Sequence, residues 1–510
     1  MTFVIKPGHM TLAELRDIYR NSTQLDLEKS AWNDIRASRK VVDDITDQGK
    51  TVYGINTGFG LLAQTSIPVD QLELLQTNLV LSHSTGVGKP LPDDVIRLIY
   101  TLKISSLAQG HSGIRVSTME AFLGFVNSGL IAEIPEKGSV GASGDLAPLA
   151  HMTCALMGEG FVRFNGKRMA AKDGLEKAGL KPHKLSSKEG LAFLNGTQVS
   201  TALALKGLFQ TEDIFAAAVV AGAMSIDALM GSVAPFDPRI HIARGQPGQI
   251  DVAPLYLELM AGSEINKAHA DCEKVQDPYS LRCQPQVMGA CLDVIRNVAR
   301  TLLIEANAVT DNPLIFTDNG DVISGGNFHA EPVAFAADML TLAICEIASI
   351  SERRLSIMVD PKMSDLPAFL VKNSGVNSGF MIAQVSAAAL VSENKSRAHP
   401  SSVDSIPTSA NQEDHVSMAT YGARRLTDMC FNSSTVVGIE LLAAAQGIDF
   451  RAPHKTSDKL AKVHQKIRSK VPHYTVDRYF APDLEEATKM VLSGTFSDHV
   501  IKILPSGTAI

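Results

Sequence analysis

Runs of basic residues, paired cysteines and uninterrupted apolar segments are all missing from this chain of 510 residues. A formal net charge of −7 without a long basic run argues against a nucleic-acid partner. The six cysteines form no Cys-x-x-Cys pair and no metal-site spacing, which indicates free thiols in a reducing compartment. Residues 1–7 contain no apolar core of signal-peptide length, and the apolar stretch 199–230 carries four charged side chains. We therefore expect a cytoplasmic protein with no membrane segment, no nucleic-acid partner and no metal.

Long apolar segments rich in small residues dominate the second half of the chain. A chain of this length, with 45% hydrophobic residues, can form two or three ordinary domains or one large helical domain. Four long helices are predicted, each roughly 40–50 Å long at 1.5 Å per residue. Several are apolar nearly all round, which is typical of helices at the centre of an assembly. These helices are predicted at 197–230, 281–309, 328–358 and 411–446.

The first 195 residues have a mixed character. Residues 131–135 are predicted to be extended, and residues 158–187 to contain strands. We expect a mixed N-terminal domain over 1–195 and a long-helix bundle domain over 196–510, which ends in helices at 455–469 and 482–503. The shorter helices of the first part are predicted at 12–19, 27–47, 72–81, 93–110, 117–129 and 146–157.

The tripeptide Ala142-Ser143-Gly144 can form an electrophile from its own backbone. Attack of the Gly144 amide nitrogen on the carbonyl carbon of Ala142 closes a five-membered ring and releases water. Loss of the Ser143 hydroxyl as a second water then leaves an exocyclic methylidene carbon conjugated to that ring. Gly144 offers an unhindered amide and backbone angles barred to residues with a Cβ, and Ala142 lets the turn tighten.

A simpler interpretation stays open at this point. At ordinary residue frequencies such a tripeptide occurs by chance in about one chain of this length in six, and Ser143 or Asp145 can cap the next helix. A nucleophile elbow is excluded, because Gly-x-Ser-x-Gly requires glycine where Asp145 stands. The complete run from Gly138 to Leu149 is far more specific than the tripeptide.

Polar and aromatic side chains collect just before each of the four long predicted helices. Unpaired N–H groups and the macrodipole at helix N-termini favour negative charge. Capping explains Asn195, but it does not explain Tyr279 or Phe328. A site that holds a carboxylate and stabilises developing negative charge would be built in this way. The four groups are Asn195, Gln276–Arg282, Gly326–His329 and Gln412–His415.

Two further features precede the tripeptide in the chain. Residues 53–60 contain three glycines among polar and aromatic residues, so they form either an ordinary surface loop or a lid that presents Tyr53. His83 stands at the end of a predicted helix, where a lone histidine is usually a C-cap. Neither region has the spacing of a phosphate-binding or dinucleotide-binding loop.

The run from Gly138 to Leu149 resembles, position for position, the loop that carries the 4-methylidene-imidazol-5-one (MIO) group in the ammonia-lyases of histidine and aromatic amino acids. The resemblance implies a mainly α fold of the fumarase/aspartase-like type, with a long central antiparallel helical bundle and a mixed N-terminal domain carrying the MIO loop. It also implies that MIO forms autocatalytically from Ala142-Ser143-Gly144, without a metal or diffusible cofactor. Ala330 departs from the family, which more often has glycine there. The resemblance extends over essentially the whole chain and is strongest at 53–60, 82–83, 138–149, 195–196, 276–286, 310–313, 325–329 and 412–415.

Within that family, Ser82-His83 and Glu413 resemble the branch that acts on histidine. The reaction implied is elimination of ammonia from L-histidine to give trans-urocanate, the first step of histidine degradation. Tyr53 would take the β-proton, Arg282 with Asn195 would hold the substrate carboxylate, and His83 with Glu413 would bind the imidazole. The implied catalytic residues are Ala142, Ser143, Gly144, Tyr53, Tyr279 and Glu413, and the implied substrate-binding residues are His83, Asn195, Gln276, Arg282 and Phe328.

The short connection between the helices predicted at 281–309 and 328–358 contains a predicted β-hairpin, so the two helices should be antiparallel. Arg282 and Phe328 would then lie roughly 40 Å apart within one chain. If both serve one site, they come from different subunits, and the resemblance implies a homotetramer. Two alternatives remain: a phenylalanine or tyrosine ammonia-lyase or 2,3-aminomutase, and a helical scaffold that has lost its chemistry.

Overall fold

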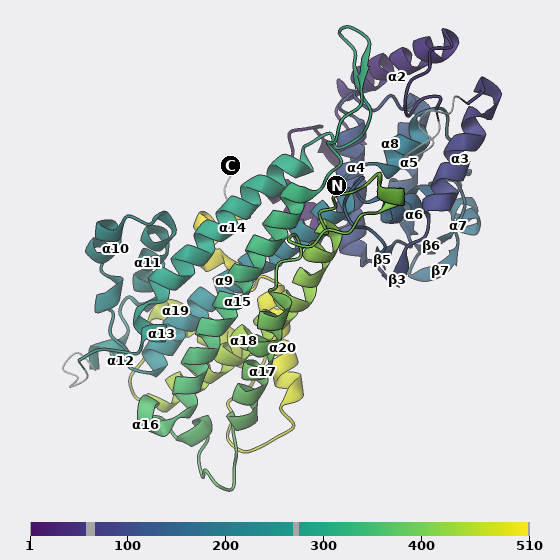
Figure 1. The fold of residues 1–510 in the computed structure, drawn as a ribbon. Coiled ribbons are helices and arrows are strands. Elements are labelled where there is room, and N and C mark those ends of the chain that lie inside the picture. The colour runs from purple at the N-terminus through teal and green to yellow at the C-terminus, as the bar shows by residue number, and fades with distance from the viewer. Residues whose placement is uncertain (1, 58–66, 269–274, 508–510) are drawn as a thin grey trace. The chain divides into compact units, whose positions relative to one another are not determined.

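The computed structural model describes residues 2–57, 67–268 and 275–507. The chain forms two compact units (Figure 1). The expected domain boundary at residue 195 stays a prediction, and the first unit also includes two later segments of the chain. The first unit comprises Met1–Lys206, Arg300–Asp338 and Pro400–Arg424, and the second comprises Gly207–Ala299, Met339–His399 and Arg425–Ile510.

Short helices make up most of the N-terminal part of the first unit, and their predicted positions are largely confirmed. The helix predicted at 27–47 begins later than expected, because Leu25 and Leu27 alternate with exposed residues and belong to a strand. The helices are α1 (Leu12–Arg20), α2 (Ala31–Asp47), α3 (Leu72–His83), α4 (Asp93–Leu107), α5 (Val116–Asn127), α6 (Leu146–Leu156), α7 (Ala171–Lys177) and α8 (Glu189–Leu194).

Four small sheets accompany these helices, and no sheet in the described ranges exceeds three strands. The extended segment at 131–135, the strands within 158–187 and the hairpin between the long helices are confirmed. Strands β1 (Thr2–Ile5) and β2 (Gln24–Leu27) are parallel, whereas the other pairs are antiparallel. Those pairs join β3 (Val87–Pro90) with β5 (Pro135–Lys137), β4 (Ile131–Ala132) with β6 (Phe161–Phe164), β6 with β7 (Lys167–Ala170), and β8 (Leu314–Phe316) with β9 (Asp321–Ile323).

Aromatic side chains pack in the core between α4 and α5. The Tyr100 ring meets Phe122 and Phe125 edge to face, with ring centroids 5.8 and 6.0 Å apart, an arrangement that aromatic quadrupoles favour. The Tyr100 hydroxyl, which is buried, accepts a hydrogen bond from the Ala132 N–H at 2.7 Å. This contact links α4 to the strand that leads the chain toward residues 138–145.

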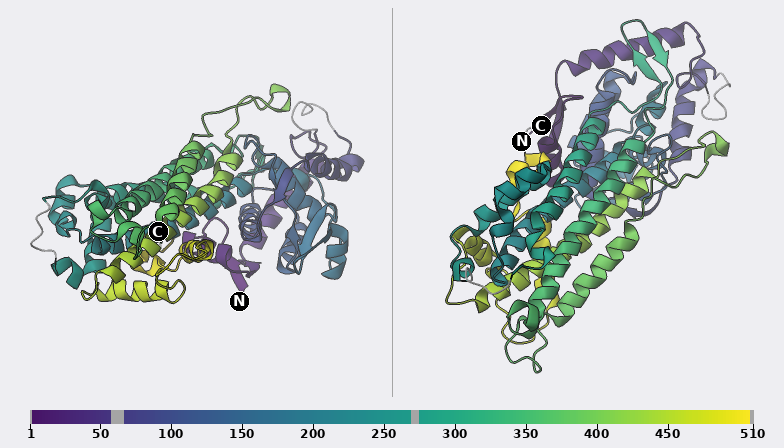
Figure 2. Two further views of the ribbon diagram at one scale, coloured as in Figure 1. Left: turned by 90° about the horizontal axis from the view of Figure 1, so that it is seen from below. Right: turned by 60° about the vertical axis from the view of Figure 1, so that its left-hand side comes forward.

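Four long helices contribute residues to both units: α9 (Gln198–Ala228), α14 (Gln284–Ala306), α15 (Glu331–Val359) and α18 (Ala419–Phe450). Within the second unit, Cys291 donates to the carbonyl of Ala343, and the Asn297 amide contacts the sulfur of Met339. As the residue number rises along α14 from 291 to 297, the number of the contacted residue on α15 falls from 343 to 339. The two helices are therefore antiparallel, which confirms the prediction. Figure 2 shows the long helices from two further directions.

Shorter helices complete the second unit. The helix predicted at 482–503 ends earlier than expected, because Gly494 adopts a φ of 71° and 3-10 turns follow it. The shorter helices are α10 (Pro238–Arg244), α11 (Pro247–Met260), α12 (Glu264–Ala268), α13 (Tyr279–Arg282), α16 (Pro361–Ser364), α17 (Met381–Arg397), α19 (Asp458–Arg468) and α20 (Ala481–Leu492).

The predicted start of the fourth long helix, at residue 411, is wrong, because α18 begins at Ala419. Asn411 and Met418 have φ values of 65° and 58°, which a right-handed helix cannot contain. The polar cluster that includes Glu413 therefore lies in an irregular segment and not at a helix N-terminus.

A buried ion pair lies inside the second unit. Arg354 on α15 donates to the carboxylate of Glu440 on α18 at 2.5 and 2.8 Å, and both side chains are fully buried. Glu440 also accepts from Ser225 on α9 and from Ser351, each at 2.6 Å. One carboxylate thus ties three long helices together, and removal of one charged partner from such a pair typically costs about 3–5 kcal/mol.

Helix α15 is long and apolar enough, by length and composition alone, to cross a bilayer. However, 61% of its apolar window is buried inside the structure. Such burial is typical of a core helix.

Candidate active site

Residues 138–145 form an irregular loop between β5 and α6, so Ser143 lies just before a helix N-terminus as predicted. Gly144 has a φ of 74°, and a Cβ there would lie 2.3 Å from the carbonyl oxygen of Gly196. Only glycine fits this conformation and this approach. The Asp145 N–H donates to the same Gly196 oxygen at 2.8 Å, which fixes the loop against the residues before α9.

The carboxylate of Asp145 is fully buried and anchors this loop. It accepts hydrogen bonds from the Ser139 hydroxyl at 2.9 Å, from the Ser200 N–H and hydroxyl at 2.8 and 2.9 Å, and from the Thr420 hydroxyl at 2.6 Å. Asp145 makes no side-chain capping bond to α6. The interpretation of Asp145 as a simple helix cap is therefore wrong.

Two distant segments hold the first half of the loop. The carbonyl oxygen of Gly141 accepts from the Ala330 N–H and from the Ser417 hydroxyl, each at 3.1 Å. The Val140 carbonyl accepts from the Met418 N–H at 2.8 Å. Ala330, the position that departs from the expected glycine, is fully buried at this contact.

Ser143 is held at both its hydroxyl and its carbonyl group. Its hydroxyl donates to the Glu413 carboxylate, and its carbonyl oxygen accepts from the Asn195 side-chain amide at 2.9 Å. The other oxygen of Glu413 accepts from the Thr408 hydroxyl at 2.7 Å. The structure thus brings together three residues that the sequence places far apart.

A buried lysine supports Asn195 from behind. Lys103 on α4 donates to the carbonyl oxygen of Asn195 at 2.5 Å. Burial lowers the pKa of Lys103 to about 7, an effect that nearby Asp311 only partly offsets. Sequence reasoning missed this residue, although a single lysine within the apolar run 95–107 was a signal for it.

Ser143 lines a cavity of about 290 Å³. Burial lowers the pKa of His83, and the Leu79 carbonyl and Glu413 only partly offset this effect. His83 is therefore neutral near pH 7, with Nδ1 located 3.1 Å from the Ser82 hydroxyl. The cavity is lined by Ser82, His83, Thr85, Gly138, Ser139, Val140, Ala142, Ser143, Gly144, Leu146, Ala147, Thr408 and Glu413.

Tyr53 and Phe328 are half-buried, and within the described ranges neither lines this cavity. Tyr53 lies in a turn that Asn56 holds, because the Asn56 side chain accepts from the Val52 N–H and donates to the Lys50 carbonyl. Residues 58–60 of the predicted lid lie outside the described residues. Phe328 lies in the turn before α15.

Gln276, Tyr279 and Arg282 belong to the second unit. Gln276 is exposed, and Tyr279 is 71% exposed. The Arg282 guanidinium lies over the Tyr279 ring, 4.5 Å from its centroid. The Arg282 Nε atom is buried and has no hydrogen-bond partner within the described part of the chain.

A family model for the aromatic amino acid lyases matches residues 10–469. The chain belongs to this family. A histidine ammonia-lyase of Burkholderia vietnamiensis is 61% identical over 493 residues, which are 97% of each chain. The solved histidine ammonia-lyase of Trypanosoma cruzi is 42% identical with a TM-score of 0.91, over 99% of this chain and 96% of that one. Tyrosine aminomutase from Streptomyces globisporus is 33% identical with a TM-score of 0.93, over 98% and 99%. These neighbours confirm the predicted fold class.

Proposed function

We propose that this member of the aromatic amino acid lyase family eliminates ammonia from L-histidine to give trans-urocanate, the first step of histidine degradation. The observation that carries the proposal is the position of Ser143, whose hydroxyl contacts Glu413 in a cavity that His83 also lines. The 61% identity to a histidine ammonia-lyase supports the choice of substrate. A cavity of about 290 Å³ suits an amino acid.

The residues around the tripeptide fit the MIO group. Ala142 is buried, Gly144 has a positive φ, and Asn195 holds the Ser143 carbonyl, so the turn is already tight where the ring would close. The Glu413 carboxylate contacts the hydroxyl that leaves as water. Once formed, MIO supplies an electrophile that makes the substrate amine a better leaving group. No metal or diffusible cofactor is required, so activity should survive dialysis against a chelator.

His83 and Glu413 are the groups we assign to the substrate imidazole. A neutral imidazole has one donor and one acceptor nitrogen, and leaving either unpaired in a buried pocket costs about 1–3 kcal/mol. Glu413 accepts from one nitrogen, and His83, whose pKa burial lowers, complements the other. A phenyl ring offers neither group a partner, so the same pair selects against phenylalanine.

We assign the substrate carboxylate to Arg282, helped by Asn195. The partnerless Nε of Arg282 supports this role, because a buried donor without an acceptor is costly until an anion arrives. Gln276, Tyr279 and Phe328 would shape the pocket beside the electrophile, and Tyr279 would act there with Glu413 in the chemistry. These residues would reach one site from different subunits of a cytoplasmic homotetramer.

Tyr53 is our candidate base for the β-proton. A tyrosine has a reference pKa of about 10, so the positive ends of helices must stabilise its phenolate for catalysis near neutral pH. Deletion of this hydroxyl in Tyr53→Phe should leave MIO formation intact and lower turnover by at least about a hundredfold, the usual contribution of general base catalysis.

Product analysis tests the function directly. The purified protein is incubated separately with L-histidine, L-tyrosine and L-phenylalanine, and the products are identified by absorbance and mass. We expect urocanate and ammonia from histidine and no β-amino acid. Cinnamate, coumarate or a β-amino acid as the main product would support the alternative lyase or aminomutase, and no product with any amino acid would support the inactive scaffold.

A further inference from the structure

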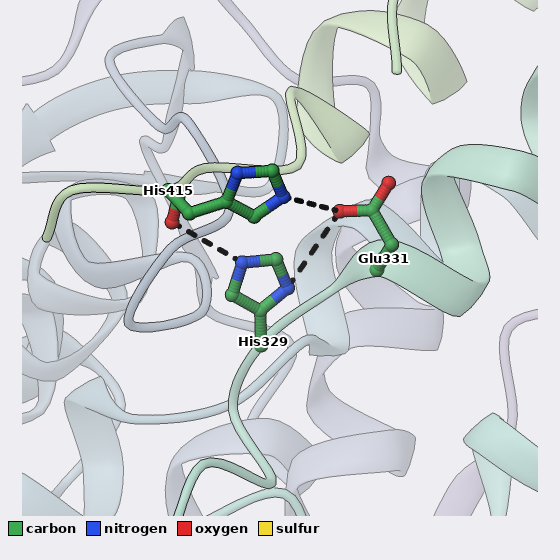
Figure 3. A group of neighbouring side chains, drawn as sticks. All are labelled: His329, Glu331 and His415. Atoms are coloured by element: carbon green, nitrogen blue, oxygen red, sulfur yellow. Dashed lines mark hydrogen bonds and ion pairs between the residues drawn. The ribbon is translucent and has the colours of Figure 1, made fainter. Parts of the chain in front are cut away.

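Two histidines and a glutamate meet on the surface of the first unit, outside the cavity described above (Figure 3). His329 lies before α15, Glu331 is the first residue of α15, and His415 lies in the irregular segment before α18. One nitrogen of each imidazole faces the same oxygen of Glu331, with His329 Nδ1 at 3.8 Å and His415 Nε2 at 3.9 Å. All three atoms lie within 4.8 Å of one another.

The outer ring nitrogens of both histidines have polar partners of their own. His329 Nε2 lies 3.2 Å from the carbonyl oxygen of His415. A carbonyl can only accept, so Nε2 carries the proton and Nδ1 presents its lone pair to Glu331. His415 Nδ1 lies 3.4 Å from the Ser405 hydroxyl, which also accepts from the Val416 N–H. In the tautomer in which this Nδ1 is the donor, which is the tautomer that a metal ion at Nε2 requires, Nε2 of His415 likewise turns its lone pair toward Glu331.

When both imidazoles are neutral and carry their protons on the outer nitrogens, three electron-pair donors face one another. The Glu331 oxygen at their centre is buried and has no hydrogen-bond partner within the described ranges. The two imidazole rings are stacked, with an interplanar angle of 11° and centroids 5.7 Å apart. Such a set repels itself electrostatically unless a positive charge lies between its members.

We propose that His329, Glu331 and His415 bind a divalent transition-metal ion of the zinc class. Two neutral imidazoles and one carboxylate form a ligand set that binds zinc in preference to magnesium or calcium, which favour oxygen ligands. Tetrahedral bonds of about 2.1 Å place ligand atoms roughly 3.4 Å apart, so the three atoms must approach by about 0.5–1.5 Å. His415 is 69% exposed, which leaves its side chain room for that movement and a fourth position open to water.

The outer hydrogen bonds already orient both rings, as they do for the histidine ligands of known zinc sites. The ion would also join the two segments that hold the MIO loop. His329 and Glu331 flank Ala330, which donates to Gly141, and the segment of His415 continues to Ser417, which contacts the same carbonyl. The ion is therefore a clamp beside the loop and takes no part in the elimination.

The test measures metal binding and thermal stability of the full-length protein, so it does not depend on turnover or on the proposed function. Metal-free protein is titrated with Zn²⁺ by calorimetry, and Co²⁺ is used as a spectroscopic probe because thiolate ligands would produce a distinct charge-transfer band. Wild-type protein should bind one ion per chain at this site and melt at a higher temperature in its presence. His415→Ala and Glu331→Gln should each weaken this binding at least tenfold, and His454→Ala, at an exposed histidine outside the cluster, should not.

His415 is exposed, so its replacement should not disturb folding, and circular dichroism checks this point in each variant. Affinity should also fall on acidification, because protons compete for the imidazole nitrogens. Equal Zn²⁺ binding by wild-type and His415→Ala protein would overturn the proposal. The absence of binding to wild-type protein below millimolar Zn²⁺ would overturn it as well, and would leave the cluster to be stabilised by a shared proton.

Discussion

The hydroxyl of Ser143 donates a hydrogen bond to the carboxylate of Glu413, which lies 270 residues later in the chain. One contact therefore joins the residue whose hydroxyl would be lost in forming the electrophile to a residue that we assign to the substrate. A change at Glu413 can affect both maturation and specificity, so experiments on this site must measure mass and turnover separately.

The purified protein should weigh two waters less than its sequence, with the loss confined to the peptide that contains residues 142–144. Ser143→Ala should fold normally, show no such loss and have no measurable turnover, because the hydroxyl required for dehydration is missing. Ser30→Ala is the matched control, since Ser30 is exposed and makes no side-chain capping bond. Intact-mass spectrometry decides the point, and an unmodified mass in an active preparation would contradict it.

His83→Leu should lower kcat/KM for histidine by roughly 5- to 150-fold, because it leaves an imidazole nitrogen unpaired at a cost of about 1–3 kcal/mol. Glu413→Gln should also lower kcat/KM, because it keeps an acceptor for the imidazole N–H but removes the negative charge that strengthens this hydrogen bond. Weak activity on phenylalanine should appear in His83→Leu, where an apolar side chain replaces a polar one. Each variant is checked by intact mass, so that a failure to form MIO is not mistaken for a loss of specificity. Unchanged histidine turnover in both variants would move the specificity assignment elsewhere.

Lys103 should make folding stability depend on pH. Burial lowers the pKa of Lys103 to about 7 from a reference value of 10.5, so the unfolded state binds more protons between these values. Stability therefore rises with pH in this window, by up to about 1.4 kcal/mol per unit. Lys103→Met should lose this slope between pH 7 and 10 in denaturant titrations. Lys172→Met, at an exposed position, is the control. Parallel curves for wild-type and Lys103→Met protein would refute the assignment.

Sites shared between subunits should permit complementation. Ser143→Ala and Arg282→Ala should each be inactive alone, because each removes a group that every site needs. In mixed oligomers assembled at random, about a quarter of the sites would receive both intact residues, and activity should return to that extent. Sedimentation checks that the mixed preparation is oligomeric. Mixed oligomers that remain inactive, or an active monomer, would exclude shared sites.

Much of the fold could be predicted from periodic patterns, but the site depends on contacts that such patterns do not contain. The long apolar runs predicted α9, α14 and α15 to within a few residues at most ends. The start of α18 could not be predicted, because left-handed conformations at Asn411 and Met418 have no sequence signal comparable to glycine. The contact of Lys103 with Asn195 and that of His329 with His415 each join segments that meet only in the folded chain, so neither could be predicted from the sequence.

The anchors of the loop at 138–145 also affect when the protein can mature. Gly144 packs against Gly196, Gly141 is held by Ala330 and Ser417, and Asp145 accepts from Thr420. A nascent chain that ends before residue 417 lacks the hydrogen bonds from Ser417 and Thr420 even when Gly196 and Ala330 are present, so its tripeptide is not fully held. We therefore expect truncated products of synthesis to be chemically inert, and the mass of the loop peptide to report whether a given molecule has completed folding.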